Sequence, residues 1–145
     1  MMPTVLVVIV HYRTPALTID CLRSLEAEIR AYRNASVVVV DNQSQDGSAA
    51  RIAEAIRSQG WSGWARLVES PVNGGFAYGN NHVIGPALAT ANPPDYFWLL
   101  NPDTTIYPGS MTSLIGWWPV PGTLARTVAW MASGDSAASV TSEGK

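Results

Sequence analysis

Cysteine and histidine are scarce in this sequence. Its 145 residues include one cysteine, Cys21, and two histidines, His11 and His82. A single cysteine excludes an internal disulfide, and these three side chains are too few for a structural zinc cluster. The shortage of cysteine is typical of a reducing compartment, so we expect a cytoplasmic protein.

Charged residues are also few, at 14%, and the formal net charge is −2. Because Lys and Arg are not clustered, no nucleic acid partner is expected. Long apolar runs are missing as well: the apolar segment 5–10 is far shorter than the roughly 20 residues of a membrane span. We therefore expect no transmembrane segment, which leaves peripheral contact with the inner face of the membrane open.

Hydrophobic residues make up 47% of the chain, enough for the core of one globular domain. Their spacing predicts four strands that alternate with helices. The strands are expected at 4–11, 36–40, 66–69 and 96–100, and the helices at 15–32, 48–58, 80–90 and 110–118. The order β-α-β-α-β-α-β predicts an α/β fold, with a mostly parallel sheet flanked by helices.

The last part of the chain has a different character. Pro119 and Pro121 interrupt it, and the residues that follow show neither a helical nor a strand period. We therefore predict a folded unit, residues 1–118, and an irregular, poorly ordered tail, residues 119–145.

Polar motifs follow three of the predicted strands. Asp41 comes directly after one strand, Asn73 follows the next, and Asp103 follows the last. In parallel sheets ligands bind outside the carboxyl ends of the strands, so these residues should meet at one edge.

Each motif also has a plainer explanation. Asp41, in VDNQSQDGS, could accept hydrogen bonds from a ribose hydroxyl or a base N–H, or it could be an ordinary turn residue. In NGGFAYGNN the glycines would let a diphosphate approach the backbone before a helix, or they could form a flexible loop. In NPDTT, Asn101 and Asp103 could hold a divalent cation on a diphosphate, or they could form a Pro-Asp turn.

Taken together, VDNQSQDGS, NGGFAYGNN and LLNPDTTIYPG, after a leading VVIVHYRT, resemble the family 2 glycosyltransferases of the Rossmann-like GT-A fold. The resemblance is strongest to the rhamnosyltransferase-like branch and covers residues 4–115. It implies that base and ribose are bound by His11, Tyr12 and Asp41, and that the nucleotide sugar is bordered by Asn73, Gly75, Gly79, Asn80 and Asn81. Asn101 stands where the family's D-x-D motif has its first Asp, and Asp103 would bind Mg²⁺ or Mn²⁺.

The resemblance also implies a reaction. It is an inverting transfer of a sugar, with rhamnose as one candidate, from a dTDP- or UDP-sugar to a glycan or lipid-linked acceptor in polysaccharide synthesis. The general base is expected in the family's chain beyond the fourth strand, so this sequence offers no residue for it and should be truncated and inactive, or nearly so. The alternative is a non-catalytic remnant that binds nucleotide sugars. A sugar nucleotidyltransferase fits less well, since HYRTPALT lacks the glycine-rich basic loop that such an enzyme needs after its first strand.

Overall fold

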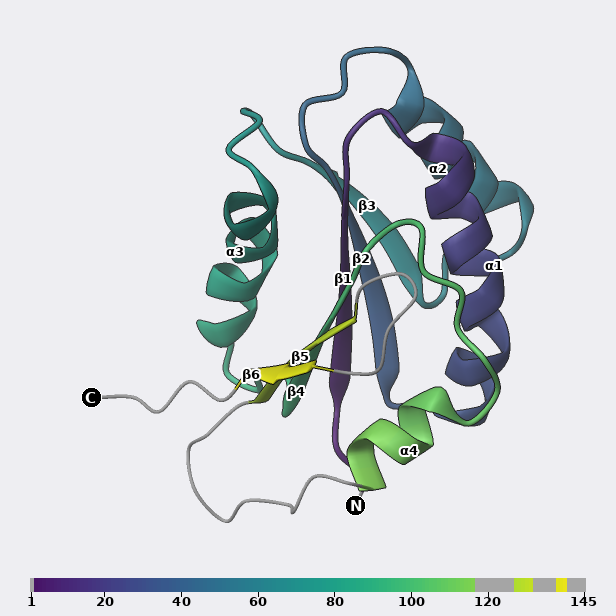
Figure 1. The fold of residues 1–145 in the computed structure, drawn as a ribbon, viewed down its shortest axis with the longest axis vertical. Coiled ribbons are helices and arrows are strands. Elements are labelled where there is room, and N and C mark those ends of the chain that lie inside the picture. The colour runs from purple at the N-terminus through teal and green to yellow at the C-terminus, as the bar shows by residue number, and fades with distance from the viewer. Residues whose placement is uncertain (1, 117–126, 132–137, 141–145) are drawn as a thin grey trace.

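The computed structural model describes residues 2–116, 127–131 and 138–140 (Figure 1). Strands and helices alternate through most of this part of the chain. In chain order the elements are β1 (Val5–His11), α1 (Pro15–Ala31), β2 (Ala35–Asp41), α2 (Ser48–Ser58), β3 (Ala65–Glu69), α3 (Phe76–Leu88), β4 (Tyr96–Leu100), α4 (Ser110–Gly116), β5 (Thr127–Met131) and β6 (Ala138–Val140).

The strands form one sheet in the order β3-β2-β1-β4-β5-β6. All neighbouring pairs are parallel except β5 and β6, which are antiparallel. The predicted α/β fold with a mostly parallel sheet is confirmed. The chain adds β2 and β3 on one side of β1 and then crosses to place β4 on the other. This reversal puts the ligand crevice of such a fold at the carboxyl ends of β1 and β4.

Helices cover both faces of the sheet, and the alternating side chains of β1 to β4 fill two cores. Figure 1 shows α1 and α2 on one face and α3 on the other. Val5, Val7 and Ile9 of β1 pack toward α1 and α2, while Leu6 and Val8 pack on the α3 side.

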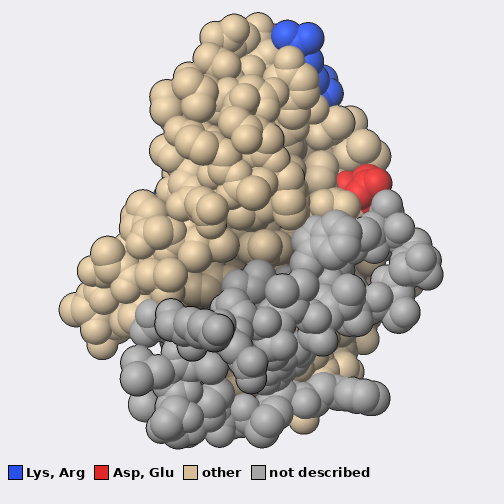
Figure 2. Space-filling model, turned by 60° about the vertical axis from the view of Figure 1, so that its left-hand side comes forward, with Lys and Arg blue, Asp and Glu red and all other residues tan. Residues whose placement is uncertain are grey.

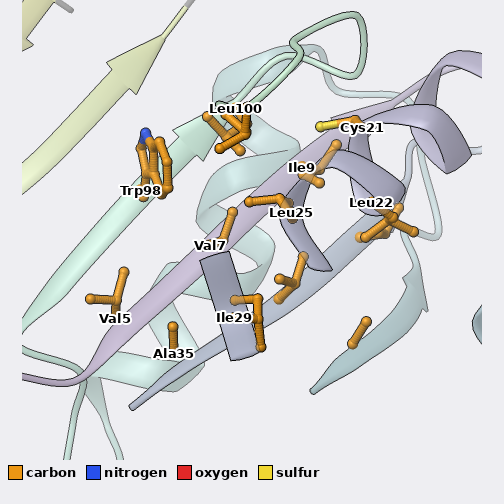
Figure 3. Close-up of a cluster of buried hydrophobic side chains, with 14 of the residues drawn as sticks. Val5, Val7, Ile9, Cys21, Leu22, Leu25, Ile29, Ala35, Trp98 and Leu100 are labelled. Atoms are coloured by element: carbon orange, nitrogen blue, oxygen red, sulfur yellow. The ribbon is translucent and has the colours of Figure 1, made fainter. Parts of the chain in front are cut away.

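The core under α1 is built from its apolar stripe (Figure 3). Leu22 and Leu25 are fully buried, and Ile29 continues the same face one turn later. Burying each such side chain contributes about 1.5–3 kcal/mol, so this stripe fixes the position of α1 on the sheet.

Two parts of the structure differ from the sequence prediction. The third helix was expected at 80–90 but begins at Phe76, because Gly75 makes the turn with φ +88° and Gly79 donates to its carbonyl. The segment 119–145 was expected to be irregular, yet it contributes β5, which pairs with β4, and β6. The rest of that segment, and residues 117–118 of the fourth predicted helix, lie outside the described residues.

Helix α3 approaches the sheet closely at Gly79. A Cβ atom at this position would lie 2.6 Å from Cγ1 of Val10 in β1, while a Cβ at Gly85 of the same helix would meet nothing within 4 Å. Glycine therefore serves at position 79 as a spacer between helix and sheet.

Gly79→Ala should accordingly lower the free energy of unfolding by about 1–3 kcal/mol, since the added methyl overpacks the contact with Val10. Gly85→Ala is the comparison variant and should change it by no more than about 1 kcal/mol, because alanine favours the helix whereas the following Pro86 disfavours a helical residue with a Cβ. Urea unfolding measures both, and a neutral Gly79→Ala would show that the contact is not tight in solution.

Candidate functional site

The first part of the site lies where β1 and β2 end side by side. His11 and Asp41 are register partners, and both are buried, with 1% and 4% of their surfaces exposed. His11 Nε2 lies 2.8 Å from Asp41 Oδ1. Tyr12 points outward, and the Arg13 guanidinium lies 5.0 Å from the centre of its ring. The structure thus brings His11, Tyr12 and Asp41 to one edge of the sheet, as predicted from the sequence.

Burial controls the charge of His11. It lowers the pKa of the imidazole below its usual 6.5, and the nearby Asp41 and Asp46 carboxylates offset this only in part. The ring is therefore neutral at pH 7. Nε2 faces Asp41, so the other ring nitrogen, Nδ1, is a buried polar atom without a hydrogen-bond partner in the described structure.

The loop after β2 is tied to the loop after β1. Asp41 Oδ2 accepts the Ser44 N–H at 3.0 Å, and Ser44 Oγ accepts the Arg13 N–H at 2.9 Å. Arg13, Gln43 and Gln45 all have positive φ, at 54°, 60° and 53°. Such backbone angles are uncommon for non-glycine residues and cluster at functional sites.

The glycine-rich loop is held by side chains from the β2 end. The Asn42 amide donates to Asn73 Oδ1 at 2.9 Å, and Gln43 bridges the loop by donating to Pro71 O at 3.0 Å and accepting the Asn73 N–H at 3.1 Å. Asn73 Oδ1 also accepts the Gly75 N–H at 3.2 Å. Asn73 and Gly75 are therefore brought to the same edge as Asp41. Sequence reasoning missed Asn42, Gln43 and Ser44, although all three fall inside the VDNQSQDGS motif.

The Gly79-Asn80-Asn81 stretch, predicted as a turn, lies inside α3. Gly79 packs on Val10, and Asn80 is buried with its amide donating to Phe76 O at 3.0 Å, while Asn81 is exposed. Of these three residues, only Asn80 has a buried polar side chain.

The NPD turn follows β4. Asn101 is half-buried and Asp103 is exposed. Cys21 Sγ lies 4.0 Å from Asn101 O, and burial, together with the Asp103 charge, raises the pKa of this thiol to about 12. The turn therefore sits over the start of α1, and Cys21 stays protonated at neutral pH.

A metal ion would find few protein ligands here. In the described part of the chain, no group of three or more His, Cys, Asp or Glu side chains is placed to hold one. Asp103 offers one free carboxylate, which fits a cation that takes most of its oxygens from substrate phosphates and water.

Buried polar atoms without a partner gather at this edge of the sheet. Among the described residues, two of these atoms are the Tyr96 hydroxyl oxygen and Trp98 Nε1 of β4. Two more, His11 Nε2 and Asp41 Oδ1, lie 2.8 Å from each other, as described above. The others all follow the carboxyl ends of strands or lie in the first turns of α3: His11 Nδ1, Thr14 Oγ1, Asn42 Oδ1, Asn80 Oδ1 and Thr104 Oγ1. Buried polar groups are nearly always hydrogen-bonded, so this set indicates a binding place for a polar ligand or ordered water.

The surface of the described part includes two grooves of similar size. One, of about 440 Å³, adjoins Asp41 and runs between Gln43, Glu69 and the start of α2. The other, of about 460 Å³, lies between α3 and β3 and contains none of the predicted site residues. The first is the one that belongs to the candidate site.

The family model for glycosyl transferase family 2 matches residues 6–139, which is most of the chain. The chain therefore belongs to glycosyl transferase family 2. The match also extends past residue 115, where the resemblance read from the motifs ended.

Among solved structures, the chain is similar to a mannosyltransferase from Pyrobaculum calidifontis, PcManGT, in complex with GDP-Man and Mn²⁺. The TM-score is 0.68 at 19% sequence identity, with 81% of this chain and 32% of that chain covered. The chain thus spans about a third of that structure and shares its fold over this part. A search of curated protein sequences finds no match. Within the described residues, no helix is long and apolar enough to cross a membrane.

The lowered pKa of His11 makes stability depend on pH. Below pH 6.5 the unfolded chain binds a proton that the folded His11 resists, so the free energy of unfolding should fall as the pH drops from 6.5 through the folded pKa. Above pH 6.5 the stability linked to the neutral His11 ring is fully present. His11→Asn should remove this pH dependence. Its free energy of unfolding, measured by urea unfolding, should change less between pH 8 and pH 5 than that of the wild type.

His82→Asn is the control for this experiment, because His82 is exposed on α3. It should keep the wild-type profile. A wild-type pH slope that persists in His11→Asn would show that another group is responsible.

Proposed function

We propose that this chain is the nucleotide-sugar-binding half of an inverting glycosyltransferase. The observation that carries the proposal is the set of unpartnered buried polar atoms, which gathers at the edge of the sheet where a fold of this family binds its donor. His11, Asn42 and Asn80 contribute three of these atoms from three different elements or loops.

In this proposal the base and ribose lie at the ends of β1 and β2. The neutral His11 ring holds Asp41, whose carboxylate accepts hydrogen bonds from donors on the ligand. Tyr12 offers an exposed ring on which a base can stack, and Arg13 lies against that ring.

The diphosphate would lie against Asn73, Gly75 and the start of α3, where backbone N–H groups favour an anion. No residue between 70 and 94 is charged, and Figure 2 shows a largely uncharged surface on the α3 side. With no Lys or Arg in this segment, its own side chains cannot balance the diphosphate charge. This supports the use of a divalent cation.

Asp103, with Asn101 beside it, would hold Mg²⁺ or Mn²⁺ on the diphosphate. The ion would neutralise the charge that grows on the leaving group during sugar transfer. The structural relative is a complex with Mn²⁺ and GDP-Man, whereas the branch that the motifs resemble suggests dTDP or UDP and a sugar such as rhamnose.

The acceptor would be a glycan or a lipid-linked saccharide in polysaccharide synthesis, in the cytoplasm or at the inner face of the membrane. A carboxylate base must take the proton of the acceptor hydroxyl, and none of the residues assigned above has that role. Nucleotide-sugar binding without transfer is therefore the second candidate function.

Asp103→Ala tests the proposal directly. Wild-type protein titrated with dTDP, UDP and GDP, with and without Mn²⁺, should bind at least one of them more tightly with the metal. Asp103→Ala should lose this gain, a loss of about 1.4 kcal/mol or more, which is tenfold in Kd. Its metal-free affinity should stay at the wild-type value.

Asp20→Asn is the matched control, because Asp20 is exposed on α1 and pairs with Arg23 at the surface. It should bind like the wild type. A metal-dependent gain that survives Asp103→Ala unchanged would refute the metal role, and a wild-type chain that binds none of the three nucleotides would refute the proposed function. Sugar transfer to an acceptor above the rate of donor hydrolysis would exclude the non-catalytic alternative.

A further inference from the structure

One face of α1 bonds the backbone that follows the NPD turn. Cys21, Ser24 and Glu28 lie on this face at helical spacing, and we call them the anchor row. Ser24 Oγ accepts the Ile106 N–H at 3.0 Å, and Glu28 accepts the Gly109 N–H at 2.6 Å and the Met111 N–H at 2.7 Å. Together with the Cys21 contact to Asn101, these bonds follow the chain from residue 101 to residue 111. Figure 1 shows this stretch running from β4 down beside α1 to α4.

Glu28 is the unusual member of the row. Its surface is 4% exposed, and no Lys or Arg of the described structure pairs with it. A buried carboxylate is costly, and its partners here are two backbone N–H groups, one on each oxygen. Well-packed apolar residues often stabilise a fold better than buried ionic groups, so the carboxylate points to a positional task beyond stability.

The position of Asp103 depends on what flanks it. Its side chain makes no hydrogen bond or ion pair with any residue in the described part of the chain. On one side β4 holds the turn through the buried Leu100. On the other side the Thr104 N–H closes the turn on Asn101 O at 3.1 Å, and the first hydrogen bond to another element comes at Ile106, which is buried and bonded to Ser24. Between Asp103 and Ile106 there are only two residues, so the anchor row sets where the turn can lie.

We propose that Glu28 and Ser24 are positioning residues that hold the Asn101–Asp103 turn where its carboxylate meets the metal and diphosphate. This inference rests on the proposed function. Glu28 acts at a distance, through the backbone of residues 106–111. Loss of its bonds would let the turn shift away from the ligand, while the part of the site at Asp41 and Asn73 would be untouched.

Glu28→Gln is the main test, because an amide keeps the size of the side chain but offers one acceptor where the carboxylate offers two. The variant, and the wild type, are titrated with dTDP, UDP and GDP with and without Mn²⁺, under conditions where urea unfolding shows both to be folded. Metal-free affinity should stay unchanged. The gain in affinity on adding Mn²⁺ should fall roughly fivefold, the effect of about one lost hydrogen bond. Amide hydrogen exchange at Ile106, Gly109 and Met111 should quicken.

Glu26→Gln is the matched control, since Glu26 lies on the same helix and pairs with Arg30 near the surface. It should keep the wild-type gain. Ser24→Ala removes a smaller group and decides the question if Glu28→Gln does not fold, and it should also reduce the gain.

The outcomes separate the two proposals. A wild-type chain without any Mn²⁺-dependent gain overturns the proposed metal role and the positioning role with it. A wild-type gain that is retained in full by folded Glu28→Gln, or by Ser24→Ala if the former does not fold, overturns the positioning role alone. A purely structural Glu28 would lower stability and leave that gain intact.

Discussion

The rest of the structure depends on the burial of β1. This strand lies between β2 and β4, helices cover both of its faces, and all seven of its residues are buried. Because an unpaired charge inside such a strand would be costly, its body is apolar and its first titratable group comes at the last position, His11. β2 follows the same rule and ends on Asp41, which sits opposite His11 in the register. The titratable groups of these two strands therefore lie at one edge of the sheet.

The same constraint explains how much of the molecule could be predicted from its sequence. Strands buried on both faces read as unbroken apolar runs, so β1, β2 and β4 could be located, and the polar residues just after them could be expected to meet. The start of α3 was not predictable in this way, because it depends on the backbone angle of Gly75. β5 is short, and its pairing with β4 is a long-range event that no local period records. The bonds of Asn42 and Gln43 to the glycine-rich loop, and of Glu28 to residues 109 and 111, join segments 28 or more residues apart. Because these segments are far apart in the chain, the bonds leave no periodic signal in the sequence.

The candidate site combines two kinds of support. The part proposed to bind the base and ribose is held by hydrogen bonds among the loops after β1, β2 and β3, and several of its side chains are buried. The turn that carries Asp103 is different, since the carboxylate is exposed and its position is set by α1. Under the proposed function, the loops would recognise the nucleotide through fixed donors and acceptors. The turn would serve the separate task of charge balance through one carboxylate that holds the cation.

The link between Arg13 and Ser44 also determines how each position can vary among related chains. Position 13 gives its backbone N–H to Ser44 Oγ at a φ of +54°, so residues that accept the left-handed conformation would serve there, but proline would not. The Arg13 side chain adds a bond from Nε to Ser44 O at 3.2 Å. The Ser44 Oγ accepts the Arg13 N–H, while the Ser44 N–H donates to Asp41. Position 44 therefore requires a small residue with a hydroxyl. Relatives that keep this joint should therefore constrain position 13 through its backbone conformation and position 44 through its side chain. That asymmetry can be sought in sequences for which no structure exists.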